Sequence, residues 1–191
     1  MSRRLGNAAL LGLALGALVV RIEQASERSI HQLDASWTED NGKRMKLADL
    51  RGVVQMVTFF YTSCESACPL TVKALQAVAR DASSANQAHT RFLLITVDPV
   101  RDTPAALRQY RHKMHIGQDW KLLRGAATDV RKLAALLGFN YEQIDSGEFV
   151  HSNLVTVLNP HGEVVYQQNA VAGDRAALAD AIDKARAVEP Q

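Results

Sequence analysis

Cysteine is nearly missing from this chain, since only Cys64 and Cys68 occur among its 191 residues. Two thiols exclude a disulfide-rich scaffold, and on their own they cannot build a zinc site of four thiolates. The length corresponds to about one domain, which can bury a sizeable core without such crosslinks. The fold is therefore expected to rest on an ordinary hydrophobic core.

A large charge of either sign is also absent. The formal net charge is +2, and residues 1–25 contain three arginines and one glutamate, so they account for the whole excess. The rest of the chain is close to neutral, which leaves no global basic surface and argues against nucleic acid as a partner. The hydrophobic fraction of 47% and the charged fraction of 22% lie near the globular average, so wholesale disorder, collagen and coiled coil are excluded.

No clean apolar run reaches the roughly 20 residues that a membrane-spanning helix usually needs. The closest is Ala8–Val20, which follows Arg3 and Arg4 in the manner of an export signal and has no clear small-residue cleavage site behind it. We therefore expect residues 1–25 to be an export signal or an N-terminal membrane anchor. Residues 29–188 would then fold as one domain on the periplasmic side of the bacterial inner membrane, anchored or released by cleavage.

Strand and helix patterns alternate along residues 29–188. Strands are expected at Ser29–Trp37, Arg44–Lys46, Val53–Tyr61, Phe92–Val97, Trp120–Leu123, Leu154–Leu158 and Val164–Gln168. Helices are expected from Cys68, from Pro104 to about His115, at Asp129–Leu137 and at Arg175–Val188. Helical connections predict parallel pairing of the buried strands, while Asn41-Gly42 predicts an early hairpin and the last two strands a late one. The order predicts an α/β thioredoxin-like sandwich with an N-terminal β-hairpin and an inserted late hairpin.

Smaller features complete this pattern. In the helix from Cys68, the residues expected to share the face that packs on the sheet are Leu70, Leu75, Val78 and Ala79. A polar loop is expected at Ser83–Ala88. An extended segment is expected at Phe139–Tyr141, followed by a turn at Asp145–Gly147.

Both cysteines stand where the predicted strand Val53–Tyr61 passes into the next helix. The positive end of that helix stabilises a thiolate, and the carboxyl end of a strand is where open α/β sheets bind ligands. Three interpretations fit Cys64 and Cys68 at this spacing. They are a structural disulfide whose loop is too short to stabilise much, a dithiol that exchanges disulfides, and a site for a soft metal such as Cu(I) or Zn(II). The spacing alone favours disulfide exchange.

His151 shifts the balance toward a metal. It directly precedes the predicted strand Leu154–Leu158, in the loop that a thioredoxin-like fold places beside the cysteine pair. Thioredoxins carry a cis-proline at that place, whereas this chain has no proline between Pro104 and Pro160. An imidazole beside two thiolates would complete a three-coordinate copper site.

A second copper site at His112–His115 is not expected, although His and Met are copper ligands. Lys113 and the nearby Arg108 and Arg111 would repel a cation, so we interpret this segment as a solvated helix end. Arg101 and Asp102 resemble a charged site pair, but we interpret Asp102-Thr103-Pro104 as the start of a helix.

Three segments carry a family resemblance. They read Tyr-Thr-Ser-Cys-Glu-Ser-Ala-Cys-Pro at 61–69, Thr-Val-Asp-Pro-Val-Arg-Asp-Thr-Pro at 96–104 and His-Ser-Asn at 151–153. In this order and spacing they resemble the Sco/SenC family of copper-handling proteins, and the resemblance runs from about Ser29 to the last helix. Glu-Ser-Ala stands at 65–67 where the family commonly has Pro-Asp-Val, which alters the charge pattern of the loop and removes a proline.

The resemblance implies a membrane-tethered, thioredoxin-like domain that binds a copper ion through Cys64, Cys68 and His151. Asp98 matches an acid beside the family's site and would orient the metal loop, its other interpretation being a turn cap. The implied partner is a copper-receiving respiratory protein, typically cytochrome c oxidase with its dinuclear copper site, or another copper enzyme such as a denitrification reductase. A thiol reductant is a further expected partner.

Two functions therefore stand side by side. A copper metallochaperone would transfer an ion without turnover. A thiol–disulfide oxidoreductase acting on an exported partner would be an enzyme with Cys64 and Cys68 as its redox pair. The two functions share the cysteines and differ in their need for His151.

Overall fold

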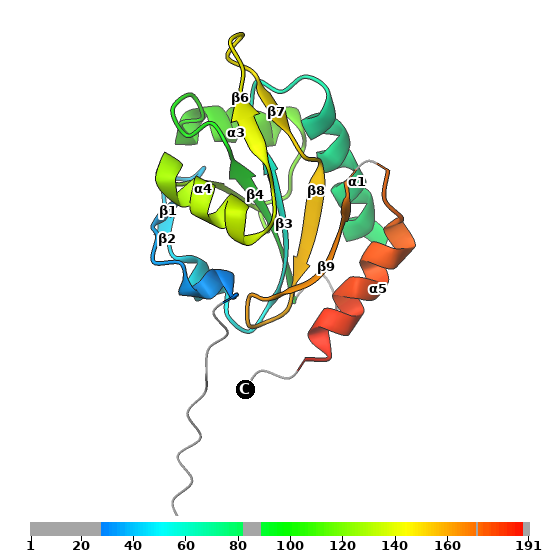
Figure 1. Cartoon of the computed structure of the whole chain (residues 1–191). Coiled ribbons are helices and arrows are strands. Elements are labelled where there is room, and N and C mark those ends of the chain that lie inside the picture. Colours follow the sequence, from blue (N-terminus) through cyan, green and yellow to red (C-terminus); the bar gives the residue numbers. More distant parts are fainter. Residues whose placement is uncertain (1–27, 82–88, 171, 189–191) are drawn as a thin grey trace, which may run out of the picture.

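The described residues, 28–81, 89–170 and 172–188, fold around one mixed β-sheet in this computed structural model (Figure 1). Its strands lie in the order β2 (Arg44–Met45), β1 (Trp37–Glu39), β5 (Lys121–Arg124), β4 (Thr90–Thr96), β3 (Val54–Phe60), β8 (Leu154–Leu158) and β9 (Val164–Asn169). β3, β4 and β5 pair in parallel, and the other strands add antiparallel neighbours. Every residue of β3 is buried, as expected for a central strand covered on both faces.

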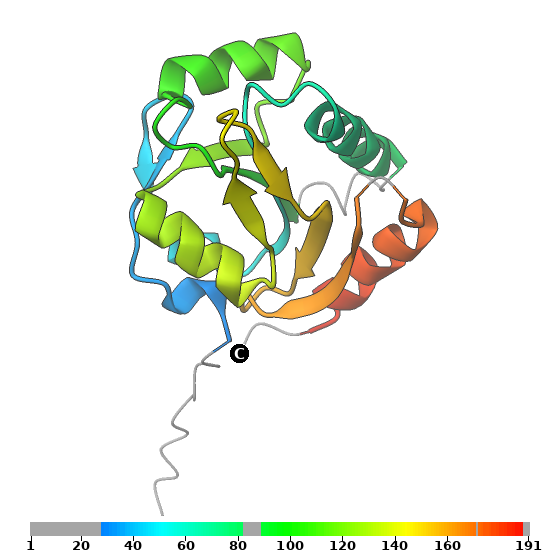
Figure 2. The ribbon, with the colours of Figure 1, turned by 45° about the horizontal axis from the view of Figure 1, so that its top comes forward.

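Helices cover both faces of this sheet. They are the short 3₁₀ helices η1 (Ile30–Gln32) and η2 (Leu47–Leu50), and α1 (Ala67–Asp81), α3 (Pro104–Lys113), α4 (Ala127–Leu136) and α5 (Arg175–Arg186). Neighbouring residues of a strand point to opposite faces. Phe60 contacts Tyr110 of α3, with ring centroids 5.0 Å apart, while Phe59 stacks on Phe139 after α4 at 4.3 Å. α1 contacts α5 and the end of α3, so these three share one face and α4 covers the other (Figures 1 and 2).

The expected N-terminal hairpin is present but shorter than predicted. Trp37 pairs with Met45, and Gly42 turns the chain with a φ of 87°, a left-handed conformation that suits glycine. The prediction of a strand over Ser29–Trp37 was wrong for most of its length. Ser29 instead caps a 3₁₀ turn, its Oγ accepting a hydrogen bond from the backbone amide of His31 at 3.1 Å, and this local bond competes with a strand.

One expected core residue of α1 is also misplaced. Leu70 is 52% exposed, whereas Val72, Leu75 and Val78 are buried. Five residues separate Leu70 from Leu75, which places them about 140° apart around a helix with 3.6 residues per turn. The prediction placed Leu70 on the buried face because it is apolar, although its position around the helix differs. Single apolar side chains on the outer surface of a helix are ordinary.

A separate hairpin of β6 (Tyr141–Gln143) and β7 (Phe149–His151) stands above the carboxyl ends of β3 and β4 (Figure 1). The sequence predicted the extended segment and the turn, but not the returning strand. His151 therefore ends a strand, paired with Tyr141, where a loop had been expected. Strands of three residues are too short to show an alternating pattern.

The expected signal or anchor at residues 1–25 and the polar loop at 83–88 lie outside the described residues. Among the described residues, no helix combines the length and the apolar character needed to cross a bilayer.

His31 should make the stability of the fold depend on pH. Burial, followed by the charge of Arg51, holds its pKa below the ordinary 6.5. The unfolded chain takes up a proton on His31 at about pH 6.5, and the folded chain resists this protonation. The free energy of unfolding is therefore fully retained above that pH and falls as the pH drops below it. We expect His31→Gln to flatten the decline in urea-unfolding free energy between about pH 7 and pH 5. An unchanged slope in the variant would contradict this account.

Candidate metal site

Three side chains from two distant segments converge at the carboxyl end of β3. Cys64 lies in the loop after β3, Cys68 in the first turn of α1, and His151 at the end of β7. Their ligand atoms all lie within 4.8 Å of one another. The backbone amide of Cys68 donates to the Cys64 Sγ at 3.3 Å, and the Cys68 Sγ lies 3.9 Å from the His151 Nε2. Both cysteines are free and buried, and His151 is half-buried.

The local electrostatics make the two thiols unequal. A hydrogen bond from the Cys68 side chain, helped by His151 and by backbone amides, lowers the pKa of Cys64 to about 3. The same sulfur–sulfur interaction and burial raise the pKa of Cys68. The hydrogen bond to Cys64 raises the pKa of His151. The reduced pair therefore holds one proton between two sulfurs, with Cys64 as the thiolate.

The His151 ring is held from three sides. Its Nδ1 lies 3.1 Å from the Ser152 carbonyl oxygen, which accepts from that nitrogen and leaves Nε2 directed at the thiols. Phe139 stacks on the ring at 5.9 Å between centroids, and the buried Tyr61 meets its edge at 6.1 Å. The orientation of the imidazole is thus set by packing as well as by hydrogen bonding.

Asp98 touches none of these three residues directly, but it is linked to the hairpin that carries His151. Its carboxylate accepts hydrogen bonds from the backbone amide and from the Nε of Arg101. Arg101 in turn donates to the Gly147 carbonyl at 2.5 Å and lies over the Phe149 ring at 5.9 Å. Asp98 is therefore a turn cap that also holds an arginine against β6–β7. The contact of Arg101 with this hairpin was not predicted from the sequence, because no spacing rule ties the residue to it.

Asp102 contacts the cysteine loop more directly, which corrects its interpretation as part of a simple helix start. It is buried and accepts hydrogen bonds from the Thr62 amide at 3.1 Å and from the hydroxyls of Thr62 and Thr96. Burial raises the pKa of this carboxyl group. Thr103 supplies the helix cap, accepting from the Ala106 amide at 3.2 Å. The side chain of Asp102 is thus free to fix the loop two residues before Cys64.

The His112–His115 segment ends α3 on the surface, with both imidazoles exposed, as the sequence indicated. Among the described residues, the metal-ligand group of Cys64, Cys68 and His151 includes neither of them. The expectation for Arg111 was wrong, because it is buried. It makes a two-point ion pair with Asp40, at 2.6 and 2.8 Å, instead of facing solvent.

The fold and the site together define a class of protein. It is a thioredoxin-like α/β protein with two thiols and an imidazole at the junction of a strand and a helix. The family model described as SCO1/SenC matches residues 23–186. The chain therefore belongs to the SCO1/SenC family.

Individual relatives agree with this assignment. The SCO1 protein homolog of Bacillus subtilis (strain 168) is 24% identical over 140 residues, which cover 71% of this chain and 72% of that protein. Copper-bound ScoI of Bradyrhizobium japonicum matches with a TM-score of 0.67 and 22% identity, over 78% of this chain and 96% of that one. BsSco, from a study of a disulfide switch in a cytochrome c oxidase assembly family, matches with a TM-score of 0.72 and 19% identity, over 82% and 94%. These two structures share the fold.

Proposed function

We propose that this protein binds one copper ion through Cys64, Cys68 and His151 and delivers it to a respiratory copper protein. The observation that carries the proposal is the convergence of three ligand atoms within 4.8 Å from segments 83 residues apart. Two sulfurs and one imidazole form a soft donor set that suits Cu(I). Copper in the similarly folded Bradyrhizobium ScoI supports this choice of metal.

The protonation states define what each ligand does. Cys64 is already a thiolate at neutral pH, so it offers a lone pair without losing a proton. Cys68 and His151, whose pKa values are raised, release their protons as the ion binds, so retention should weaken at acidic pH. Glu65 and Ser66, which lie between the two cysteines, are exposed, so a partner can contact the loop that carries the ligands.

We place the recipient among respiratory copper enzymes, with the dinuclear copper site of cytochrome c oxidase as the specific candidate. The assembly family to which BsSco belongs supports this choice. For residues 1–25 we propose an export signal or membrane anchor that places residues 29–188 outside the cytoplasm. The intact mass of the chain from periplasmic and membrane fractions tests this, and recovery of the full-length chain in the cytoplasm alone would contradict it.

A thiol–disulfide oxidoreductase is the second candidate, favoured by the opposite pKa shifts of the two cysteines. A low-pKa thiolate beside a protonated partner thiol is an arrangement that attacks disulfides. Chaperone and oxidoreductase use the same sulfurs, so only a residue that one of them does without can separate the two functions.

His151→Ala separates them. Copper retention should fall by at least about tenfold, because two thiolates alone leave the ion open to competing thiols. Reduction of a model disulfide should change far less, since the α1 N-terminus and the Cys68 thiol still stabilise the Cys64 thiolate. The measurements are copper stoichiometry against a competing chelator and the rate of disulfide exchange, with His112→Ala as the exposed control. Unchanged copper retention with lost exchange would favour the oxidoreductase.

A further inference from the structure

Two adjoining hollows form a groove that starts beside the cysteine loop. The first, of 480 Å³, is lined by Glu65, Pro69, Lys73, Gln76, Lys113, Met114 and His115. The second, of 360 Å³, shares Gln76 and His115 with it and continues to Arg80, Phe92, Asp119 and Trp120. Because Glu65 lies between the two cysteines in sequence, one end of the groove lies at the loop that carries them.

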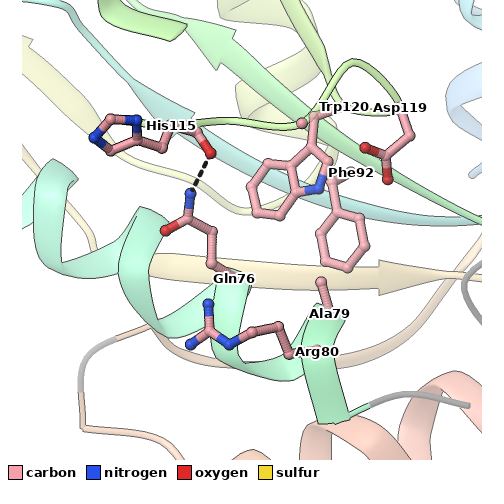
Figure 3. Close-up of a pocket in the computed structure, with 8 residues that line it drawn as sticks. Gln76, Ala79, Arg80, Phe92, His115, Asp119 and Trp120 are labelled. Carbon is pink, nitrogen blue, oxygen red and sulfur yellow. Dashed lines mark hydrogen bonds between the residues drawn. The ribbon is translucent and has the colours of Figure 1, made fainter. Parts of the chain in front are cut away.

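The walls of the groove come from one helix and one loop. Pro69, Lys73, Gln76 and Arg80 of α1 are spaced four, three and four residues apart, so they form one stripe along the helix. The opposite wall is the segment from Lys113 to Trp120 between α3 and β5. Figure 3 shows Gln76, Ala79 and Arg80 facing His115 and Trp120 across the second hollow, with Phe92 beside the indole. The Phe92 and Trp120 rings stack at 4.4 Å and form its apolar floor.

The turn at the centre of the groove has an uncommon backbone conformation that α1 holds in place. His115 has a φ of 51°, and no other non-glycine residue in the described part of the chain has a positive φ. The Gln76 side chain donates to the carbonyl oxygens of Met114 and His115 at 2.9 and 3.2 Å. Such strained residues persist where the surroundings fix them and cluster at functional sites. The imidazole of His115 is exposed between the two hollows.

The groove has cationic side chains along its length and an acidic residue near each end. Lys73 and Lys113 are exposed in the first hollow and Arg80 in the second, and none of them forms an ion pair with another described residue. Glu65 stands at the end beside the site, and Asp119 lies in the far hollow. Cations thus concentrate in the stretch nearest the site, just past Glu65.

From this arrangement we propose that the groove binds an extended acidic segment of the partner protein, with carboxylates at Lys73 and Lys113 and an apolar side chain over Phe92 and Trp120. The inference rests on the proposed function, because it assigns the surface by which the partner is held beside Cys64 and Cys68. A concave channel between a helix and a loop suits an extended peptide better than a flat lipid surface. Electrostatic attraction of this kind raises encounter rates and orients partners.

The test uses a synthetic acidic peptide rich in Asp and Glu with one Phe, together with versions in which the acids are replaced by Asn and Gln or by Lys. Nitrogen–proton correlation spectra of the reduced protein are recorded during titration with each peptide. The acidic peptide should shift the signals of Gln76, His115 and Trp120. Lys73→Glu/Lys113→Glu should weaken binding about tenfold or more, and added salt should weaken it as well.

Matched controls separate the possible outcomes. Lys43→Glu/Lys132→Glu makes the same change in net charge away from the groove and should leave peptide binding unchanged. Copper loading of Lys73→Glu/Lys113→Glu should equal that of the parent protein. If the parent protein bound peptide but no copper, the result would count against the proposed function and not against the groove. Equal binding of all three peptides, or shifts outside the groove, would overturn the proposal. Binding of phosphatidylglycerol vesicles through Lys73 and Lys113, without peptide binding, would also overturn it.

Discussion

Cys68→Ser is expected to abolish copper retention by the reduced protein. The substitution exchanges one sulfur for oxygen in a side chain that lies 3.9 Å from the His151 Nε2, and it leaves the size of the buried group nearly unchanged. A hydroxyl is a hard, protonated ligand that Cu(I) does not favour. Removing a residue that only hydrogen-bonds to a metal ligand typically lowers metal affinity about 10–100-fold. The loss of copper affinity in Cys68→Ser should be larger. Copper stoichiometry after dialysis against a competing chelator measures it.

The control for this substitution is Ser66→Ala, an exposed position between the two cysteines. It should retain copper like the parent. Oxidation that joins Cys64 and Cys68 in a disulfide should have the same effect as the serine variant, since a disulfide has no thiolate to offer. Undiminished copper in Cys64→Ser/Cys68→Ser, with an unchanged spectrum, would show that the ligands lie elsewhere.

Arg111→Met should be among the most destabilising single substitutions outside the site. Arg111 and Asp40 are both 6% exposed, and Arg111 also donates to the Trp120 carbonyl at 2.9 Å. Removing the guanidinium leaves a buried carboxylate without its partner, which typically costs about 3–5 kcal/mol. That is a large part of the roughly 5–15 kcal/mol that holds a domain folded. Urea unfolding of the reduced protein measures the loss.

The double variant Arg111→Met/Asp40→Asn should recover part of the stability, because it removes the stranded charge as well. Lys132→Met serves as the surface comparison, since Lys132 and Asp129 are 3.5 Å apart with Lys132 64% exposed, and it should cost much less. If Arg111→Met and Lys132→Met lost equal stability, the buried pair would not have the role assigned to it.

The positions of Cys64 and Cys68 could be predicted because a long apolar strand followed by a helix with proline in its first turn is unambiguous. β3 is buried along its whole length, and α1 begins at Ala67, one residue before Cys68. His151 could be placed near them only through the expected fold and the family resemblance. Nothing local to residue 151 signals the short strand in which it lies.

The supporting contacts could not be predicted, because each joins residues far apart in the chain. Arg111 and Asp40 are separated by 71 positions, and Arg101 reaches Gly147 across 46. Charged residues are mostly exposed, so composition and spacing favoured a solvated Arg111. Asp102 was assigned to a helix start because Thr103-Pro104 follows it, and nothing in the sequence indicated its contact with Thr62.

X-ray absorption spectroscopy of the copper-loaded, reduced protein tests whether Cys64, Cys68 and His151 form one copper site. We expect two sulfur ligands and one imidazole nitrogen around each ion, with the nitrogen signal lost in His151→Ala. A ligand shell without sulfur, or an imidazole contribution that persists in His151→Ala, would show that the ion is held elsewhere.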